Sequence, residues 1–146
     1  MEIKIRKAEK YDYPVIYSMI RDFAAFENCP EKLVNSLELM QKEEEFINCF
    51  VAESDSKEIV GYVVYFFAYY TWIGKSLYMD DLYVKEAFRG KRIGRSLINA
   101  VIDFAKKEDC HKLRWQVSSW NEPAIGFYKN LGATIDDVER NCDLVF

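Results

Sequence analysis

The sequence predicts a mixed α/β fold, with one central, mostly antiparallel sheet and helices on both faces. Three observations support this prediction. Apolar residues alternate with polar ones or form β-branched runs in some stretches, and they recur at helical spacing in others. These stretches follow the order β-α-α-β-β-β-α-β-α-β. The chain has 146 residues, 50% of them hydrophobic, which suits a single domain over residues 1–146 with a sizeable core.

The N-terminal part is predicted to hold one strand and two helices. Residues 3–5 alternate aliphatic and charged side chains, as strands do. Asp12 is a suitable helix N-cap, and Pro14 follows in the first turn, where its missing N–H costs little. Apolar residues then recur at helical spacing over 15–23. The acidic stretch 33–45 is predicted to be a second, more exposed helix.

Three strands are predicted in the middle of the chain. The first is short and covers residues 50–52, and residues 54–57 form a turn after it. Residues 59–69 are rich in valine and aromatic side chains, which favour strands. The third strand covers residues 76–84, and residues 70–75 form a hairpin connection before it.

The C-terminal half is predicted to begin with a long amphipathic helix. Its apolar positions are Ile93, Leu97, Ile98, Val101, Ile102 and Ala105. Residues 112–118 are predicted to form a strand. Asn121 caps a short helix with Pro123 in its first turn, and Gly132 ends that helix. The tail, residues 134–146, is predicted to hold a final strand.

Composition and charge argue against several classes of protein. The net charge of -4 disfavours nucleic acid and leaves room for a cationic ligand. The four cysteines form no CxxC pair and there is one histidine, so we expect no metal site. The N-terminus lacks the pattern of a signal peptide, and no apolar run approaches the roughly 20 residues of a membrane span. We therefore expect a reduced cytoplasmic protein that binds neither nucleic acid nor membranes.

A basic, glycine-containing segment follows the last of the middle strands and opens the long helix. It reads Arg89-Gly90-Lys91-Arg92-Ile93-Gly94 and continues with Arg95. Backbone N–H groups and the helix dipole make such a helix start an anion site, and glycines allow close backbone approach. The pattern indicates a pyrophosphate site, although a basic loop with glycines for turning is the alternative.

The strand before this loop carries two adjacent acids, Asp80 and Asp81, among apolar residues. Neighbouring residues on a regular strand point to opposite faces. Because burying an unpaired charge is costly, at least one acid is expected in a cleft or beside polar partners. An edge strand with ordinary surface acids is the alternative. Residues 120–133 form a third notable segment, in which Phe127 and Tyr128 would be core aromatics on periodicity alone.

Together these segments resemble the GNAT N-acetyltransferases. The family's R/Q-x-x-G-x-G/A signature falls on residues 89–94, with Arg92 at the position usually held by the central glycine. The family's N-x-x-A-x-x-x-Y-x-x-x-G-[FA] pattern falls on Asn121, Ala124, Tyr128, Gly132 and Ala133. The resemblance implies the GNAT acyl-CoA N-acyltransferase fold. It also implies direct transfer of acetyl from acetyl-CoA, the cosubstrate, to a primary amine, with no metal.

A closer resemblance is to the diamine (spermidine/spermine) acetyltransferases and their thialysine-acetylating relatives. Residues 72–81 resemble that subfamily's W-I-G-K-x-L-Y-L-E-D stretch, although Asp80 stands where the subfamily usually has Glu. Residues 120–123 match its W-N-E-P. Phe26 and Glu27 lie where the subfamily has an aromatic–glutamate pair. The resemblance implies a small polycationic acceptor and a homodimer.

The resemblance also assigns roles. An alkylammonium has a pKa near 10, so a base must remove a proton before the amine can attack. Asp80 is the expected base, with Asp81 as the alternative, and Tyr128 is the expected general acid. The expected cofactor-binding residues are Leu82, Tyr83, Val84, Arg89, Gly90, Lys91, Arg92, Ile93, Gly94, Arg95, Asn121, Ala124 and Tyr128. The expected acceptor-binding residues are Phe26, Glu27, Trp72, Asp80 and Asp81.

Other readings stay open at this point. The acceptor could be thialysine, another amino-acid derivative or a protein amine. The chain could also be a catalytically weak acyl-CoA-binding protein, a reading that Arg92 favours, or a purely structural module.

Overall fold

A mixed sheet in the order β1-β2-β3-β4-β5 lies at the centre of the first of two units into which the chain divides. The computed structural model describes residues 1–146, with Met1–Trp115 in the first unit and Gln116–Phe146 in the second. The strands are β1 (Ile3–Lys7), β2 (Asn48–Ser54), β3 (Ile59–Tyr70), β4 (Gly74–Val84) and β5 (Leu113–Arg114). Strands β1 to β4 pair antiparallel, and β5 pairs with β4 in parallel. The predicted mixed, mostly antiparallel sheet is confirmed.

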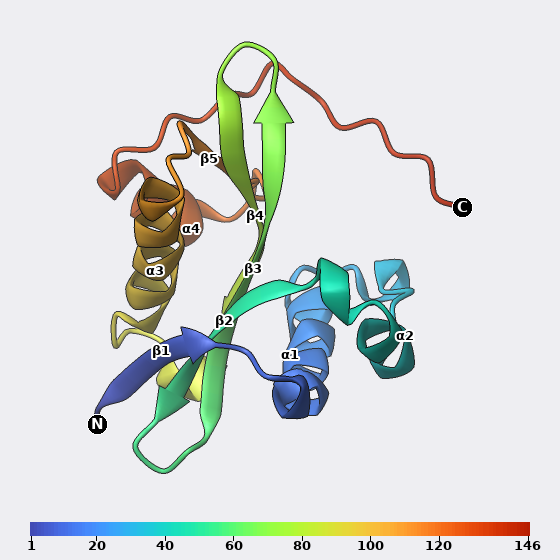
Figure 1. Ribbon diagram of the computed structural model, residues 1–146, viewed down its shortest axis with the longest axis vertical. Coiled ribbons are helices and arrows are strands. Elements are labelled where there is room, and N and C mark those ends of the chain that lie inside the picture. The colour runs from blue at the N-terminus through green and yellow to red at the C-terminus, as the bar shows by residue number, and fades with distance from the viewer. The chain divides into compact units, whose positions relative to one another are not determined.

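Helices cover both faces of this sheet. Figure 1 shows α1 (Tyr13–Phe26) and α2 (Leu37–Lys42) on one side and α3 (Ile93–Lys107) on the other. Phe104 of α3 packs against the sheet. Its ring lies 5.3 Å from that of Tyr65 on β3 and 6.2 Å from that of Phe50 on β2. The first unit therefore has the layered helix–sheet–helix arrangement that the sequence predicts.

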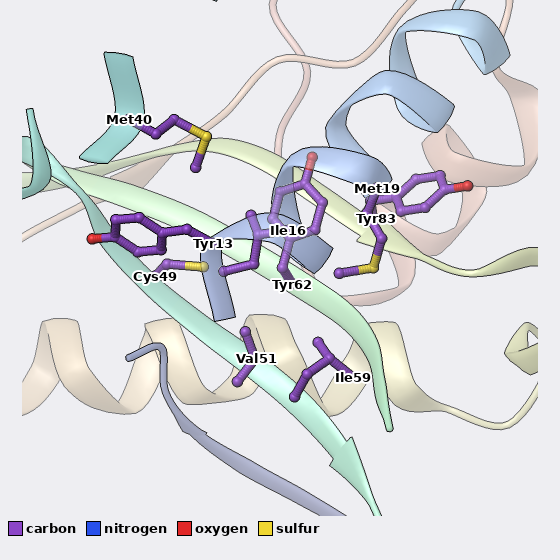
Figure 2. Packing of buried hydrophobic residues seen from close by; sticks show 9 residues of the cluster. All are labelled: Tyr13, Ile16, Met19, Met40, Cys49, Val51, Ile59, Tyr62 and Tyr83. Atoms are coloured by element: carbon purple, nitrogen blue, oxygen red, sulfur yellow. The ribbon is translucent and has the colours of Figure 1, made fainter. Parts of the chain in front are cut away.

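The core beneath α1 is rich in aromatic and sulfur-containing side chains (Figure 2). It contains Tyr13, Ile16, Met19, Met40, Cys49, Val51, Ile59, Tyr62 and Tyr83. Burial raises the pKa of the Cys49 thiol to about 12. This thiol is therefore protonated at neutral pH and acts as a core residue, since the thiolate is the nucleophilic form.

Asp12 lies at the N-cap position of α1, as predicted, but its side chain does not cap the helix. Its carboxylate accepts hydrogen bonds from the Arg6 guanidinium, at 2.8 and 3.0 Å, and from the Glu9 N–H, at 2.7 Å. Burial alone would raise the pKa of Asp12, but the hydrogen bonds from Arg6 and Glu9, together with the charge of Arg6, outweigh it and the pKa is lowered. Asp12 thus ties β1 to the start of α1.

The second unit contains α4 (Glu122–Asn130) and an irregular tail. The side-chain oxygen of Asn121 accepts from the Ala124 N–H at 3.3 Å, and Gly132 has a φ of 91° just past the helix, as the sequence predicts. The predicted final strand in residues 134–146 is wrong, because this tail has no strand. Its apolar residues Val138, Leu144 and Val145 are more than 80% exposed, and no strand pairs with them.

The strand predicted over residues 112–118 is also shorter than expected, because only Leu113–Arg114 pairs with β4. No helix has both the length and the apolar character needed to cross a membrane.

Candidate active site

The start of α3 has backbone N–H groups without a side-chain cap. The N-cap residue Arg92 makes no side-chain capping hydrogen bond, and the first hydrogen bond of the helix runs from the Ser96 N–H to the Arg92 carbonyl at 3.1 Å. The N–H groups of the preceding first turn therefore have no acceptor within the helix. The side chains of Lys91, Arg92 and Arg95 are exposed around them. These donors and cations suit a pyrophosphate such as that of acetyl-CoA.

Arg92 adopts the backbone conformation that explains why glycine is usual at this position. Its φ of 63° and ψ of 17° lie in the left-handed region. A non-glycine residue in that region costs about 1 kcal/mol or more. The loop thus keeps the shape that a glycine would allow, at a cost to stability, and gains a cation.

Two residues of the basic segment have their side chains engaged within the protein. Ile93 is 3% exposed and packs in the core. The guanidinium of Arg89 lies over the rings of Phe26, at 5.0 Å, and Tyr83, at 5.3 Å, and its Nε donates to the Val84 carbonyl at 2.9 Å. Arg89 therefore links the basic segment before α3 to the end of α1 and the end of β4.

The second half of β4 has an unpaired edge. Strand β4 pairs with β3 along its length, but with β5 only at Leu77 and Tyr78. The edge of β4 from residue 79 to residue 84 therefore has no strand partner. Leu82, Tyr83 and Val84 lie on this stretch, where a free backbone N–H or carbonyl can bind an extended ligand as a neighbouring strand would.

Asp80 and Asp81 lie at an irregularity in this strand. Residue Val63 of β3 is opposite Leu82, and Tyr65 is opposite Met79, so β4 advances three residues where β3 advances two. Such a bulge interrupts regular alternation and redirects side chains. The prediction that the two acids point to opposite faces assumed a regular strand, which is absent at this point.

The two acids differ in environment. Burial, the charge of Asp80 and the charge of Glu27 raise the pKa of Asp81 to about 6, against a hydrogen bond from Tyr62 that lowers it. The Tyr62 hydroxyl donates to Asp81 Oδ2 at 3.1 Å. Asp80 keeps an exposed surface, yet the protein around it desolvates the carboxylate enough to raise its pKa.

Glu27 follows the last residue of α1, and its charge acts on Asp81. The structure thus brings Phe26, Glu27, Asp80 and Asp81 into one region of the first unit, which we call the acid cluster. No group of three or more His, Cys, Asp or Glu side chains in the chain is arranged to hold a metal ion. The negative charge of the acid cluster suits ammonium groups.

Trp72 lies far from the acid cluster. It occupies the tip of the β3–β4 hairpin, with 97% of its surface exposed. It lies in the turn before β4, whose first residue, Gly74, precedes Asp80 by roughly 20 Å along the strand. A groove at this tip is lined by Tyr69, Tyr70, Thr71, Trp72, Lys112 and Arg114. Arg114 and Lys112 lie over the ring of Tyr70, so the groove is cationic.

The remaining predicted site residues, Asn121, Ala124 and Tyr128, lie in the second unit. The Asn121 side chain is the N-cap of α4 and bonds to the Ala124 N–H. Ala124 and Tyr128 are four residues apart, so they share one face of the helix. The Tyr128 ring is partly buried and lies 5.3 Å from the ring of Phe127.

Two contacts around the acid cluster of the first unit were not predicted from the sequence. Nothing in the sequence indicates that Tyr62 bonds to Asp81, beyond the presence of a phenol inside an apolar strand, which needs a partner for its hydroxyl when buried. Nothing indicates the stacking of Arg89 on Phe26 either, because these two residues are far apart in the chain.

Comparison with known proteins shows the family of the chain. The model of the acetyltransferase (GNAT) family matches residues 12–133. The chain belongs to this family. It is an acyltransferase, and dependence on acetyl-CoA is general to its members.

Related proteins place it near amine acetyltransferases. It is 36% identical over 141 residues to the mouse thialysine N-epsilon-acetyltransferase, covering 89% of this chain and 83% of the relative. It is 30% identical over 140 residues to the human spermidine/spermine N(1)-acetyltransferase-like protein 1, covering 89% of this chain and 20% of that protein.

An aminoglycoside acetyltransferase from an uncultured soil metagenomic sample has the same fold, with a TM-score of 0.79 and 22% identity. The match covers 99% of this chain and 96% of the other. The GNAT fold predicted from the sequence is confirmed.

Proposed function

We propose that this protein transfers acetyl from acetyl-CoA to a primary amine of a small polycationic acceptor, a diamine or polyamine. The acid cluster supports the proposal, because the charges of Glu27 and Asp80 both raise the affinity of Asp81 for protons. Cations offset the electrostatic repulsion between neighbouring carboxylates. An acceptor with two or more ammonium groups satisfies more than one of them at once.

Asp80 is the proposed general base. It has the more exposed carboxylate of the pair, and its raised pKa brings it nearer to the operating pH, which improves a general base. The short side chain makes transfer through one water the expected route. Asp81, held by Tyr62, provides negative charge beside it and remains the alternative base.

Acetyl-CoA supplies the acetyl group and a thiolate leaving group. The first-turn N–H groups of α3, with Lys91, Arg92 and Arg95, are proposed to bind its pyrophosphate, and the unpaired edge of β4 to bind its extended arm. A backbone N–H of Leu82, Tyr83 or Val84 polarises the acetyl carbonyl. Tyr128 donates its phenolic proton to the leaving sulfur.

Thialysine is the second candidate acceptor, which the 36% identity to the mouse enzyme favours. Thialysine carries a carboxylate as well as two amines. Arg89, beside Phe26, is a cation near the acid cluster that could pair with it. Turnover of thialysine without turnover of polyamines would favour this reading.

The test follows release of the CoA thiol with acetyl-CoA and, in turn, putrescine, spermidine, spermine, thialysine and lysine. We expect turnover of the polyamines and a large loss in Tyr128→Phe and Asp80→Asn. Tyr11→Phe and Asp55→Asn are matched controls, because both residues are exposed and lie outside the site. Acetyl-CoA binding without turnover of any amine would indicate the weak acyl-CoA binder instead.

A homodimer in the cytoplasm stays a prediction. The exposed Tyr69, Trp72 and Ile73 at the hairpin tip provide apolar surface for a second copy. Trp72 could act in acceptor binding only across such a dimer, because it lies far from the acids of its own chain. Sedimentation of the wild type and of Trp72→Ala tests whether the chain dimerises through Trp72.

A further inference from the structure

Tyr62 is a buried phenol with one polar contact. Its side chain is fully enclosed, at 0% exposure, on the face of β3 that packs against α1 (Figure 2). Its ring lies 6.2 Å from that of Tyr83, the residue opposite it on β4. Its hydroxyl donates to Asp81 Oδ2 at 3.1 Å. The ring thus belongs to the core, while the hydroxyl faces the acid cluster.

The direction of this hydrogen bond is determined by its partner. An ionised carboxylate can only accept, so the Tyr62 O–H must point at Asp81. No buried side-chain nitrogen or oxygen in the chain lacks a hydrogen-bond partner. Asp81 itself lies at the bulge, where the strand does not set the direction of side chains by alternation. The hydrogen bond from Tyr62 supplies the orientation that the strand does not.

The surroundings of Asp81 otherwise oppose its ionisation. Some titratable groups change the pKa of Asp81, and the charge of Asp81 changes the pKa of others. These groups are Glu27 after α1, Cys49 on β2, Tyr62 on β3, and Tyr78 and Asp80 on β4. Cys49 and Tyr62 are neutral at pH 7 because burial raises their pKa. The charged neighbours, Glu27 and Asp80, are both acids, and the cation Arg89 is engaged with Phe26 and Tyr83.

We propose that Tyr62 is a positioning residue of the acceptor site, whose hydroxyl orients the Asp81 carboxylate and favours its ionised form for pairing with a second ammonium group of the acceptor. This inference rests on the proposed function, since it assigns the second amine of the acceptor to Asp81. Tyr62 touches neither the reacting amine nor acetyl-CoA, so its effect falls on acceptor affinity and on the pH dependence.

The test compares Tyr62→Phe with the wild type, because phenylalanine keeps the buried ring and removes only the hydroxyl. Thiol release is followed with putrescine and with butylamine, a monoamine of the same length, from pH 5.5 to 9. We expect the KM for putrescine to rise about tenfold, as for loss of a hydrogen bond to a charged group. We expect little change in kcat or in the KM for butylamine. The acid limb of kcat/KM for putrescine moves to higher pH.

Tyr65→Phe is the matched control. Tyr65 is a buried tyrosine of the same strand, 2% exposed, whose ring packs with Phe50 and Phe104 on the other face. An equal change in Tyr65→Phe, or an equal rise in KM for both amines, would overturn the inference. In a double-mutant cycle, Tyr62→Phe adds nothing to the loss of putrescine affinity in Asp81→Asn. Additive losses would also overturn it.

A second readout does not need turnover. The Asp81 carboxyl is followed by carbon-13 NMR in protein labelled at aspartate carboxyl groups, with Asp81→Asn used for assignment. We expect the pKa of Asp81 to rise in Tyr62→Phe and not in Tyr65→Phe. If no amine is acetylated, the proposed function fails, and this titration still decides whether Tyr62 controls Asp81. An unchanged titration overturns the inference even where polyamine turnover confirms the function.

Discussion

The two ends of β4 carry opposite charge in opposite surroundings. At the bulge, Asp80 and Asp81 are partly desolvated, the charge of Asp80 raises the pKa of Asp81, and Tyr62 donates a hydrogen bond to Asp81. At the hairpin tip, Lys112 and Arg114 lie over an aromatic ring beside a groove open to solvent. Desolvation gives the acid end perturbed ionisation, which is typical of functional sites, whereas solvent screens the charges at the tip. The following predictions test this contrast.

The largest expected effect separates the two ends by activity. Asp80→Asn removes the proposed base and lowers kcat/KM for the polyamine acceptor by about 100-fold or more. Lys112→Ala at the hairpin tip changes it less than about twofold, because a partly exposed charge away from the reaction acts weakly through solvent. Thiol-release kinetics measure both. A loss in Lys112→Ala as large as that in Asp80→Asn would show that the tip is part of the catalytic site.

The next effect is on stability at the acid end. The folded protein raises the pKa of Asp81 from 3.8 to about 6, so between these values the folded state binds more protons than the unfolded one. Stability therefore falls as the pH rises through this window, and the ionised carboxylate destabilises the fold above it. Asp81→Asn is expected to raise the free energy of unfolding by about 2 kcal/mol at pH 7.5 and to change it little near pH 4.

Urea unfolding at the two pH values measures this change. Asp55→Asn, in the exposed β2–β3 turn, is the control and should have no such pH dependence. A gain for Asp81→Asn that is the same at pH 4 and pH 7.5 would contradict the assignment, because only ionisation makes the gain depend on pH.

A smaller effect is expected at the loop that follows the acid end. Arg92→Gly relieves the left-handed backbone and raises the free energy of unfolding by about 1 kcal/mol. It also removes a cation from the proposed phosphate site, so the KM for acetyl-CoA should rise a few-fold. Gly90→Ala, with a φ of 78° at position 90, should instead destabilise the protein by about 1 kcal/mol. Thermal unfolding and acetyl-CoA titration check both, and a destabilised Arg92→Gly would contradict the strain argument.

The smallest effect is expected at the tip. Trp72→Ala should change the free energy of unfolding by less than about 0.5 kcal/mol at low protein concentration, because the side chain is 97% exposed. Urea unfolding over a range of protein concentrations measures this. A clear loss of stability that grows with concentration would show that a second copy buries Trp72.

Local patterns predicted most of the fold. The helical spacing over residues 15–23 corresponds to α1, and that from Ile93 to Ala105 lies within α3. The alternation and β-branched residues of the middle segment correspond to β2, β3 and β4. The prediction of a strand in the tail was wrong. A strand forms only where a neighbouring strand accepts its hydrogen bonds, and no strand pairs with residues 134–146.

The sequence by itself determined the family, the basic segment before α3 and the pair of acids, because each is a matter of residue type at short spacing along the chain. Only the tertiary structure decided that a bulge lies at Asp80 and Asp81, that Tyr62 bonds to Asp81, and that Arg92 is left-handed. It also decided that Trp72 is remote from the acids. These features depend on contacts between strands and on burial, which change the pKa and orientation of a side chain without leaving a local pattern.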